Sequence, residues 1–415
     1  MIALVLTLAA AAFRLPRLGF PPEEIFDEVY HAKTALQYLQ GEPIVEWVHP
    51  PTAKLLIAAG VWVFGYEAWA WRLLPALAGI ALAPVFYLLA RRALPSRRAA
   101  LLAASLLLCD GVYLVQSRTA MTNIFAVLFQ VAAAASILGA VLPQRLPAGP
   151  MLGAGVFLGL ALSTRWTSLW ATGFLGAVLL AGRGLRLLRP RELALTAAAF
   201  LALPILIYTA SYVPWMAQKH HPGDLSTTWA ALADMVAEQG RVWNYHANLQ
   251  AQHPYFSEWY TWPLLKRPTW YYFQQPPGTE VVRGIVAIGN PALWWASVPV
   301  SLWALGIGAR RRDPWLLFSG AGFFALYLPW GISPRTLNYN HYLFEAIPYA
   351  CLTLGRLLDD AWDARARWLA RGYLALAVLL FLFFYPFLVA LPVPQEWYNL
   401  RFRGFGPWTW FPSWI

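Results

Sequence analysis

Apolar residues in this chain of 415 residues occur in long runs that short polar gaps separate. Runs of about 20 apolar residues match the length of an α-helix that crosses a lipid bilayer. The pattern therefore predicts an all-α polytopic membrane protein, with one transmembrane domain over residues 1–415. We expect about 11 spans, at residues 2–19, 69–90, 99–117, 121–141, 151–168, 170–182, 193–213, 292–308, 314–330, 341–358 and 372–393.

The composition excludes an ordinary soluble domain. Hydrophobic residues make up 59% of the chain and charged residues 12%, whereas about 25% of the residues of a soluble domain are charged. The net charge of +11 could indicate a nucleic-acid partner, but the arginines cluster in short gaps between predicted spans. Such clusters mark the cytoplasmic side of a membrane, so we expect no nucleic-acid partner. Their alternation places the N-terminus in the cytoplasm and the C-terminal tail at 395–415 outside the plasma membrane.

Two long segments, at 20–68 and 214–290, face the outside in this topology and hold all four lysines. Within the first segment, apolar residues at helical spacing predict one helix at 25–39 and a second at 52–64. Both are amphipathic or too short to cross a bilayer comfortably, so we expect them to lie on the membrane surface. The chemistry of the protein is therefore expected at the outer face of the membrane.

The first outer segment begins with two adjacent acids, Asp27 and Glu28. Neighbours on a helix diverge by about 100°, so one carboxylate can face a reacting hydroxyl while the other holds something else. A solvated acidic turn at a helix start is the structural alternative. A metal site is a third interpretation, because Asp27 and His31 share one helical face, but no further close cluster of ligands accompanies them.

Five arginines lie outside the cytoplasmic clusters, near the outer ends of predicted spans. Burial of a guanidinium in a membrane is costly, so each is expected to have an anionic partner. A structural ion pair or a side chain that extends to water explains any single one of them, whereas several together suit a lipid-linked phosphate, whose oxygens match the guanidinium fork. These arginines are Arg14, Arg72, Arg118, Arg165 and Arg335.

Several motifs carry a resemblance to a known family. They are FDEVYHAKTALQYLQGE with HPPTAKLL, LCDGVYLVQSRTAM, STRWTSLW, HPYFSEWYTWPLLKRPTWYY, GNPALWW and NYNHYLFEAIPY. Together they resemble the protein O-mannosyltransferases, which use polyprenyl-phosphate-mannose and have the GT-C glycosyltransferase fold. The resemblance covers almost the whole chain, in the family's order. It implies inverting transfer of mannose to Ser or Thr hydroxyls of exported proteins.

The resemblance also implies roles for individual residues. Asp27 would be the general base, and Glu28 would hold the acceptor segment or the structure of the site. Arg118 and Arg14 would bind the donor phosphate or secure the loop around it. The residues expected on the donor side are Arg14, Arg118, Lys54, His49, Arg165, Arg335 and His341. Those expected on the acceptor side or in a structural role are Pro50, Pro51, Trp262 and Arg267.

The same interpretation covers cofactors and partners. A lipid phosphate is a good leaving group and arginines can stabilise its charge, so no cofactor is expected and a divalent metal is not favoured. Expected partners are polyprenyl-phosphate-mannose, an exported polypeptide with Ser or Thr, and membrane lipids. The resemblance further implies a dimer and an association with the protein export machinery.

The chain departs from the family pattern at three points. Asn123 stands where the family usually has Asp, and HPPTAK replaces the commoner HPPLGK. No segment is long enough for the soluble MIR domain of eukaryotic members, which implies a compact prokaryotic form. Acceptor recognition is then left to the loops and the tail WTWFPSWI. Two other classes stay open: a GT-C enzyme that moves another lipid-linked sugar to a lipid or cell-wall glycan, and a transporter or flippase.

Overall fold

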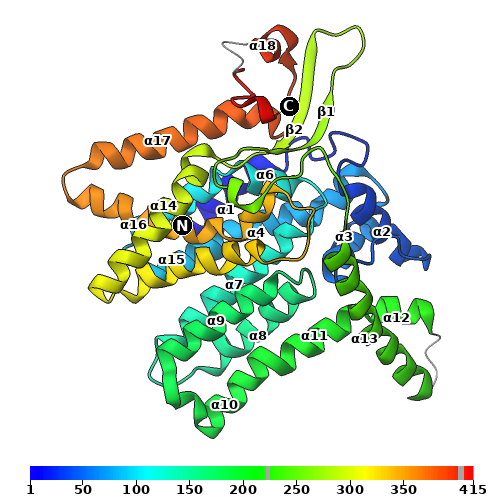
Figure 1. Ribbon diagram of the computed structural model, residues 1–415, viewed down its shortest axis with the longest axis vertical. Coiled ribbons are helices and arrows are strands. Elements are labelled where there is room, and N and C mark those ends of the chain that lie inside the picture. The colour runs from blue at the N-terminus through cyan, green and yellow to red at the C-terminus, as the bar shows by residue number, and fades with distance from the viewer. Residues whose placement is uncertain (221–224, 401–405, 415) are drawn as a thin grey trace.

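The structure is a computed structural model that describes residues 1–220, 225–400 and 406–414, and it is mostly helical (Figure 1). Six helical stretches of the described chain are long and apolar enough to cross a membrane. They are α4 (Ala68–Ala93), α7 (Asn123–Val141), α9 (Ser168–Arg183) with the turn to Leu188, α10 (Pro190–Ala197) continued by α11 (Leu203–Ser211), α14 (Pro291–Arg311), and α17 (Arg367–Phe384) with the turn to Phe387.

A seventh span is present if α5 (Arg97–Leu108) and α6 (Gly111–Arg118), which meet at 61°, are one bent helix. By this measure the prediction of about 11 spans is wrong. Several predicted spans form helices that end too early: at about 1.5 Å per residue, 13 to 17 residues cover about 20–26 Å, less than the apolar thickness of a bilayer. These helices are α1 (Ile2–Arg14), α8 (Ala148–Leu162), α15 (Pro314–Tyr327) and α16 (Ile347–Asp363).

Polar caps and small residues fix how the helices start and pack. The Asp110 side chain caps α6 by accepting a hydrogen bond of 2.8 Å from the Tyr113 amide, and it accepts another of 2.6 Å from the indole of Trp294 in α14. Gly355 lets α16 approach α5, because a Cβ at this position would lie 2.7 Å from Cβ of Ala103. Small residues at helix contacts are the usual means of close packing in membranes.

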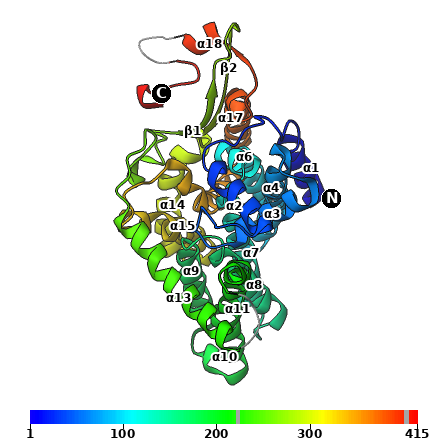
Figure 2. The ribbon, with the colours of Figure 1, turned by 90° about the vertical axis from the view of Figure 1, so that its right-hand side faces the viewer.

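The first outer segment contains the two predicted helices, α2 (Glu28–Gln40) and α3 (Thr52–Phe64). The left-handed backbone of Gly41 (φ 69°) ends α2, as glycine commonly does after a helix. Figure 2 shows α2 and α3 beside α4. The helices are confirmed, and their position on a membrane surface stays a prediction.

A small antiparallel sheet corrects the prediction of an all-α fold. Its strands are β1 (Thr269–Gln274), β2 (Val281–Ala287) and β3 (Val393–Pro394), in the order β1-β2-β3 with Thr269 opposite Ala287. The aromatic and β-branched residues of TWYYFQ and VVRGIVA favour strands. A turn that contains Gly278 (φ 72°) joins β1 to β2. The short helix α18 (Gln395–Asn399) follows β3.

The second outer segment forms α12 (Val213–Lys219) and α13 (Leu225–Asn248). Both lie on the same side of the molecule as α2 (Figure 1). A small buried cluster of Tyr212, Trp215 and Met235 packs with Tyr38 and Ile44 of the first outer segment. The two outer segments, distant in sequence, therefore contact each other directly.

Candidate active site

A buried ion pair gives the loop between α2 and α3 its shape. The Lys54 ammonium donates to the carboxylate of Glu46, to the Glu46 carbonyl at 2.8 Å and to the His49 carbonyl at 2.7 Å. Nδ1 of His49 lies 2.7 Å from Oε1 of Glu46. Burial alone would raise the pKa of the Glu46 carboxyl, but Lys54 and His49 hold this pKa well below its usual value. Glu46 was not singled out from the sequence, although it lies eight residues before Lys54 in the acid-rich segment.

The adjacent acids diverge as predicted. Glu28 is fully buried and receives two hydrogen bonds from the Arg72 guanidinium, 2.8 and 2.6 Å long, and one of 2.8 Å from the Ala120 amide. Such a two-point contact fixes both side chains. Arg72, one of the five outer arginines, therefore pairs with Glu28, and Glu28 holds the start of α2 against α4 and the end of α6.

Asp27 instead faces a cavity of about 510 Å³. Its side chain makes no capping hydrogen bond to α2. Burial raises the pKa of the Asp27 carboxyl above its ordinary value, an effect that His31 and Arg335 partly offset. We call this space the Asp27 cavity; Tyr30, His31, Tyr245, His253, Tyr339 and His341 are among the residues that line it.

A second cavity, of about 290 Å³, adjoins the first; its surface is mostly apolar and includes four indole rings. We call it the aromatic cavity. It is lined by Trp166, Trp170, Trp243 and Trp330, together with the exposed Ile332. Four residues line both cavities and so mark the place where they meet: His49, Arg165, Arg335 and Tyr342.

Arg165, between α8 and α9, is held from two sides. Its Nη1 donates to Oδ1 of Asn123 at 2.5 Å and to the hydroxyl of Thr122 at 3.2 Å. Its Nε lies 3.7 Å from a carboxylate oxygen of Glu345. Because the side chain of Asn123 is neutral, it orients the guanidinium without cancelling its charge.

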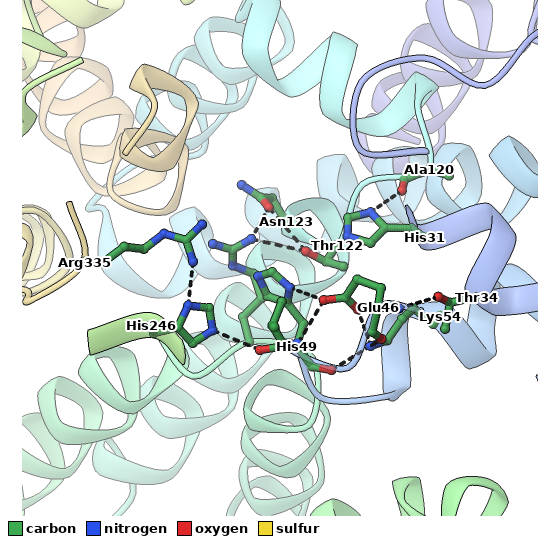
Figure 3. Close-up of polar contacts among 12 residues, drawn as sticks. His31, Thr34, Glu46, His49, Lys54, Ala120, Thr122, Asn123, His246 and Arg335 are labelled. Atoms are coloured by element: carbon green, nitrogen blue, oxygen red, sulfur yellow. Dashed lines mark hydrogen bonds and ion pairs between the residues drawn. The ribbon is translucent and has the colours of Figure 1, made fainter. Parts of the chain in front are cut away.

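Arg335 is oriented by a histidine that the sequence gave no reason to select. Nη1 of Arg335 lies 2.6 Å from Nδ1 of His246 in α13, and Nε2 of His246 lies 2.9 Å from the Val48 carbonyl (Figure 3). Among the described residues, no carboxylate forms an ion pair with Arg335 within 4.0 Å. The half-buried cation thus retains an unneutralised charge beside the Asp27 cavity.

Two of the predicted donor residues, Arg14 and Arg118, line neither cavity. The Arg14 guanidinium lies 3.9 Å from the ring centre of Tyr113 and donates to the Ser117 hydroxyl at 2.9 Å. Nη1 of Arg118 donates to the carbonyls of Arg14 (2.5 Å) and Pro16 (2.8 Å). These contacts hold the C-terminal end of α1. Phosphate binding by either residue stays a prediction without support from the geometry.

The remaining predicted residues divide between the cavity and the scaffold. His341 lines the Asp27 cavity, and burial keeps the pKa of its imidazole well below its ordinary value. Lys54 is buried inside the loop rather than on a cavity wall. Trp262 is fully buried against Trp330. The others are scaffold residues: Arg267 donates to the Pro254 carbonyl, and Pro50 and Pro51 lead into α3.

His31, Glu46 and His49 could together offer ligand atoms to a metal ion, all within 4.8 Å of one another. The sequence pointed only to Asp27 with His31. Nδ1 of His31 contacts the Ala120 carbonyl at 2.9 Å, which leaves its Nε2 available. Glu46, however, already neutralises Lys54 and is bonded to His49. A second cation at this carboxylate would meet the ammonium, so the donor set fits a metal poorly.

Comparison with known proteins identifies the family. Residues 4–68 and 67–216 match the family described as dolichyl-phosphate-mannose-protein mannosyltransferase. Residues 231–414 match the C-terminal four TMM region of protein-O-mannosyltransferase. A polyprenol-phosphate-mannose–protein mannosyltransferase of Mycolicibacterium smegmatis is 31% identical over 99% of this chain and 92% of that protein. The chain belongs to the protein mannosyltransferase family.

Further comparisons agree with this assignment. The corresponding protein of Corynebacterium glutamicum is 30% identical to this mannosyltransferase over 88% of the chain and 81% of that protein. In fold, the mannosyltransferase is similar to a chain of the S. cerevisiae Pmt1-Pmt2 complex bound to the sugar donor. The TM-score is 0.84 at 14% identity, covering 100% of this chain and 92% of that chain. ArnT from Cupriavidus metallidurans, bound to undecaprenyl phosphate, gives a TM-score of 0.59 at 18% identity over 94% and 75% of the two chains.

These findings confirm the coarser predictions. The mannosyltransferase is a glycosyltransferase and a multi-pass membrane protein with the GT-C type of fold. The bacterial relatives match it along most of their length, as the resemblance to a compact prokaryotic form implied.

Proposed function

We propose that this mannosyltransferase moves mannose, with inversion, from polyprenyl-phosphate-mannose to Ser or Thr hydroxyls of an exported polypeptide. The observation that carries the proposal is the position of Arg165 and Arg335, which line both the aromatic cavity and the Asp27 cavity. Two cations thus lie between an apolar space and a carboxylate. A phosphate that joins an isoprenoid to a sugar fits this arrangement from end to end.

The donor side follows from the chemistry of the leaving group. The isoprenoid nearest the phosphate would occupy the aromatic cavity, where indole rings offer apolar faces. The phosphate would lie against the guanidinium groups of Arg165 and Arg335. Because the phosphate gains charge as the sugar departs, cations fixed at this place stabilise the transition state more than the bound donor.

The acceptor side follows from the carboxylate of Asp27, because the other described carboxylate that lines the Asp27 cavity, that of Glu46, is paired with Lys54. Asp27 takes the proton of the acceptor hydroxyl while the hydroxyl oxygen forms a bond to the anomeric carbon. The bond from that carbon to the phosphate oxygen breaks, and the lipid phosphate leaves with the electron pair. One displacement inverts the anomeric centre and needs no covalent carboxylate nucleophile. Glu28 is unsuited to such a role because it is buried against Arg72.

We place the site at the outer face of the plasma membrane, with the N-terminus in the cytoplasm. Support comes from α4 and α9, which begin beside the site and end in arginines: Arg91 and Arg92 end α4, and Arg183 ends α9. By the positive-inside rule those ends face the cytoplasm. The single-domain organisation, the dimer and the association with export machinery remain predictions.

The principal alternative is a GT-C enzyme that transfers a lipid-linked sugar to a lipid or cell-wall glycan. Purified protein would receive polyprenyl-phosphate-mannose with either a Ser/Thr peptide or a membrane glycolipid fraction. Mass spectrometry should show a hexose added to the peptide by wild-type protein, and Asp27→Asn should add it at least about a hundredfold more slowly. Mannose on the glycolipid alone would overturn the proposal. A parallel test compares exported proteins of a deletion strain, which should lose hexose from Ser/Thr peptides.

A further inference from the structure

The proposed reaction leaves a third cavity without a role. It has a volume of about 400 Å³ and lies between the loop that follows α2 and the helices α12 and α13. We call it the Trp47 cavity. Val45 and Trp47 line both this cavity and the Asp27 cavity, so the two spaces lie on either side of one short segment. No residue that lines the Trp47 cavity also lines the aromatic cavity.

Two cation–π contacts lie in the walls of the Trp47 cavity. The guanidinium of Arg241 lies 3.8 Å from the ring centre of Trp47, and the Lys219 ammonium lies 4.2 Å from that of Trp215. Arg241 also pairs with the buried Glu238 at 3.3 Å. A cation over an indole face contributes roughly 0.5–1 kcal/mol at an exposed site and more when desolvated. The contact of Arg241 with Trp47 joins α13 to the loop that carries Glu46 and His49, whereas the contact of Lys219 with Trp215 lies within α12.

We propose that the Trp47 cavity is a subsite for the acceptor polypeptide, for residues some distance from the modified Ser or Thr. This inference rests on the proposed function. Its chemistry fits a peptide: two indoles, an amide (Gln218) and charges of both signs offer contacts to backbone amides and to mixed side chains. A phosphate headgroup would instead meet the carboxylates of Glu42 and Glu238.

The arrangement also separates the two substrates. The aromatic cavity meets the Asp27 cavity at Arg165 and Arg335, whereas the Trp47 cavity meets it at Val45 and Trp47. On the proposed path, a polypeptide crosses the segment at Val45 and Trp47 to reach Asp27, and it does not pass Arg165 or Arg335. Contacts of the protein with parts of a substrate that are remote from the reacting group supply binding energy, and this energy can improve the use of a weak acceptor.

Peptide length provides the test. An extended chain advances about 3.3 Å per residue, so a peptide of about five residues with a central Thr reaches about 7 Å on either side. A peptide of about 15 residues reaches about 23 Å on the same basis. On the proposed path we expect only the long peptide to extend beyond Trp47 into the Trp47 cavity. Wild-type protein should show a KM for the long peptide that is about tenfold lower, equivalent to about 1.4 kcal/mol.

Two variants of the full chain in neutral detergent probe the subsite. Lys219→Ala removes one cation from an exposed position, and Glu42→Trp places bulk at the exposed rim. Lys219→Ala should raise the KM of the long peptide about fivefold, which is about 1 kcal/mol. Glu42→Trp should make the KM of the long peptide equal to that of the short peptide. The matched control is Trp229→Ala in α13, a side chain that is 70% exposed and lines none of the three cavities.

The outcomes separate this inference from the proposed function. An unchanged ratio of the two KM values in both variants, with thermal unfolding like that of wild type, would overturn the subsite. So would a length effect that appears only in vesicles of anionic lipid, because it would assign the cavity to a headgroup. If wild-type protein modifies neither peptide, the proposed function itself fails. Transfer to the short peptide with no gain from length leaves that function standing and removes the subsite.

Discussion

His246 holds Arg335 in place through a fixed tautomer: its Nε2 lies 2.9 Å from the Val48 carbonyl, so Nε2–H donates and Nδ1 accepts from the Arg335 guanidinium at 2.6 Å. The pKa of His246 is lowered to about 4, first by burial and then by Arg335. The imidazole is therefore neutral near pH 7. It joins three segments, α13, the loop before α3 and the loop before His341.

We expect His246→Ala to weaken use of the donor more than use of the acceptor. Arg335 would lose its orientation, so the KM for polyprenyl-phosphate-mannose should rise by about tenfold, equivalent to about 1.4 kcal/mol. His246→Gln should recover part of the loss, since its amide oxygen can accept from Arg335. The control is His220→Ala at the end of α12, where the imidazole contacts Asp234 and lines neither reaction cavity. Equal rises in both KM values would assign His246 a general structural role.

Asp27→Asn and Glu28→Gln should fail in different ways. Asp27→Asn removes the base, and a positioned base contributes about 10²–10⁴-fold, so turnover should fall by at least about a hundredfold with unchanged thermal stability. Glu28→Gln leaves the buried Arg72 without its carboxylate, which costs about 3–5 kcal/mol for a buried pair. That variant should unfold at a lower temperature. A stable Asp27→Asn protein with more than about a tenth of wild-type turnover would contradict general-base catalysis.

The sequence predicted that the two adjacent acids diverge, but it did not predict which of the outer arginines lie at the site. The divergence of Asp27 and Glu28 follows from helix geometry, which fixes the angle between the side chains of two adjacent residues. The choice among five outer arginines does not, because convergence depends on how helices pack: Arg165 and Arg335 meet at the site, whereas Arg72 pairs with Glu28. His246 gave no signal, since one histidine in an amphipathic helix is ordinary.

Errors in the fold have a similar cause. Apolar character alone cannot tell a helix that faces lipid from one that packs inside the protein. In α16, residues Ile347 to Gly355 are all buried, and the helix then continues into charged residues. Long apolar runs do not mark the hairpin β1–β2, because its signals are aromatic and β-branched residues around the Gly278 turn.

The rate of transfer should fall at acidic pH. Asp27 acts as a base only when ionised, and burial raises its pKa above the ordinary value of 3.8. As the pH falls through this raised pKa, the fraction of ionised Asp27 and hence kcat/KM for the acceptor should fall with a slope of one. Protonation of His246 would add a second loss near pH 4. In the His246→Gln variant, residue 246 cannot titrate. The fall in kcat/KM at acidic pH that Asp27 causes should therefore persist in this variant. If kcat/KM of this variant no longer fell at acidic pH, the titration would belong to His246.

We expect turnover without a divalent metal. Glu46 is the carboxylate of the His31–Glu46–His49 group, and it already neutralises the Lys54 ammonium. Activity in excess EDTA should match the untreated enzyme, and added Mg²⁺, Mn²⁺ or Zn²⁺ should give no gain. Loss on chelation with recovery on repletion would overturn this expectation and favour a metal held by the two histidines.

Arg118 should act as a scaffold for α1. Its guanidinium donates to the carbonyls of Phe13, Arg14, Pro16 and Arg17 at 2.5–3.3 Å. Those of Phe13 and Arg14 belong to the last turn of α1, whose carbonyls have no partner within the helix. Arg118→Ala would leave the buried Arg14 carbonyl without this donor, at a cost of about 1–3 kcal/mol. Thermal unfolding should therefore begin at a lower temperature. Arg118→Lys should recover only part of the loss, because an ammonium lacks the planar fork that reaches several carbonyls.

The measurement that separates scaffold from phosphate ligand is the stabilisation by polyprenyl phosphate. A ligand that binds only the folded protein raises its unfolding temperature, and at a fixed ligand concentration above Kd this shift grows with the logarithm of the affinity. Arg118→Ala should retain the full wild-type shift, since Arg118 lines neither reaction cavity. Arg335→Ala, in contrast, should lose most of the shift with little change in the ligand-free unfolding temperature. If Arg118→Ala loses the shift and Arg335→Ala keeps it, the phosphate lies near α1 and the assignment of the donor to Arg165 and Arg335 is wrong.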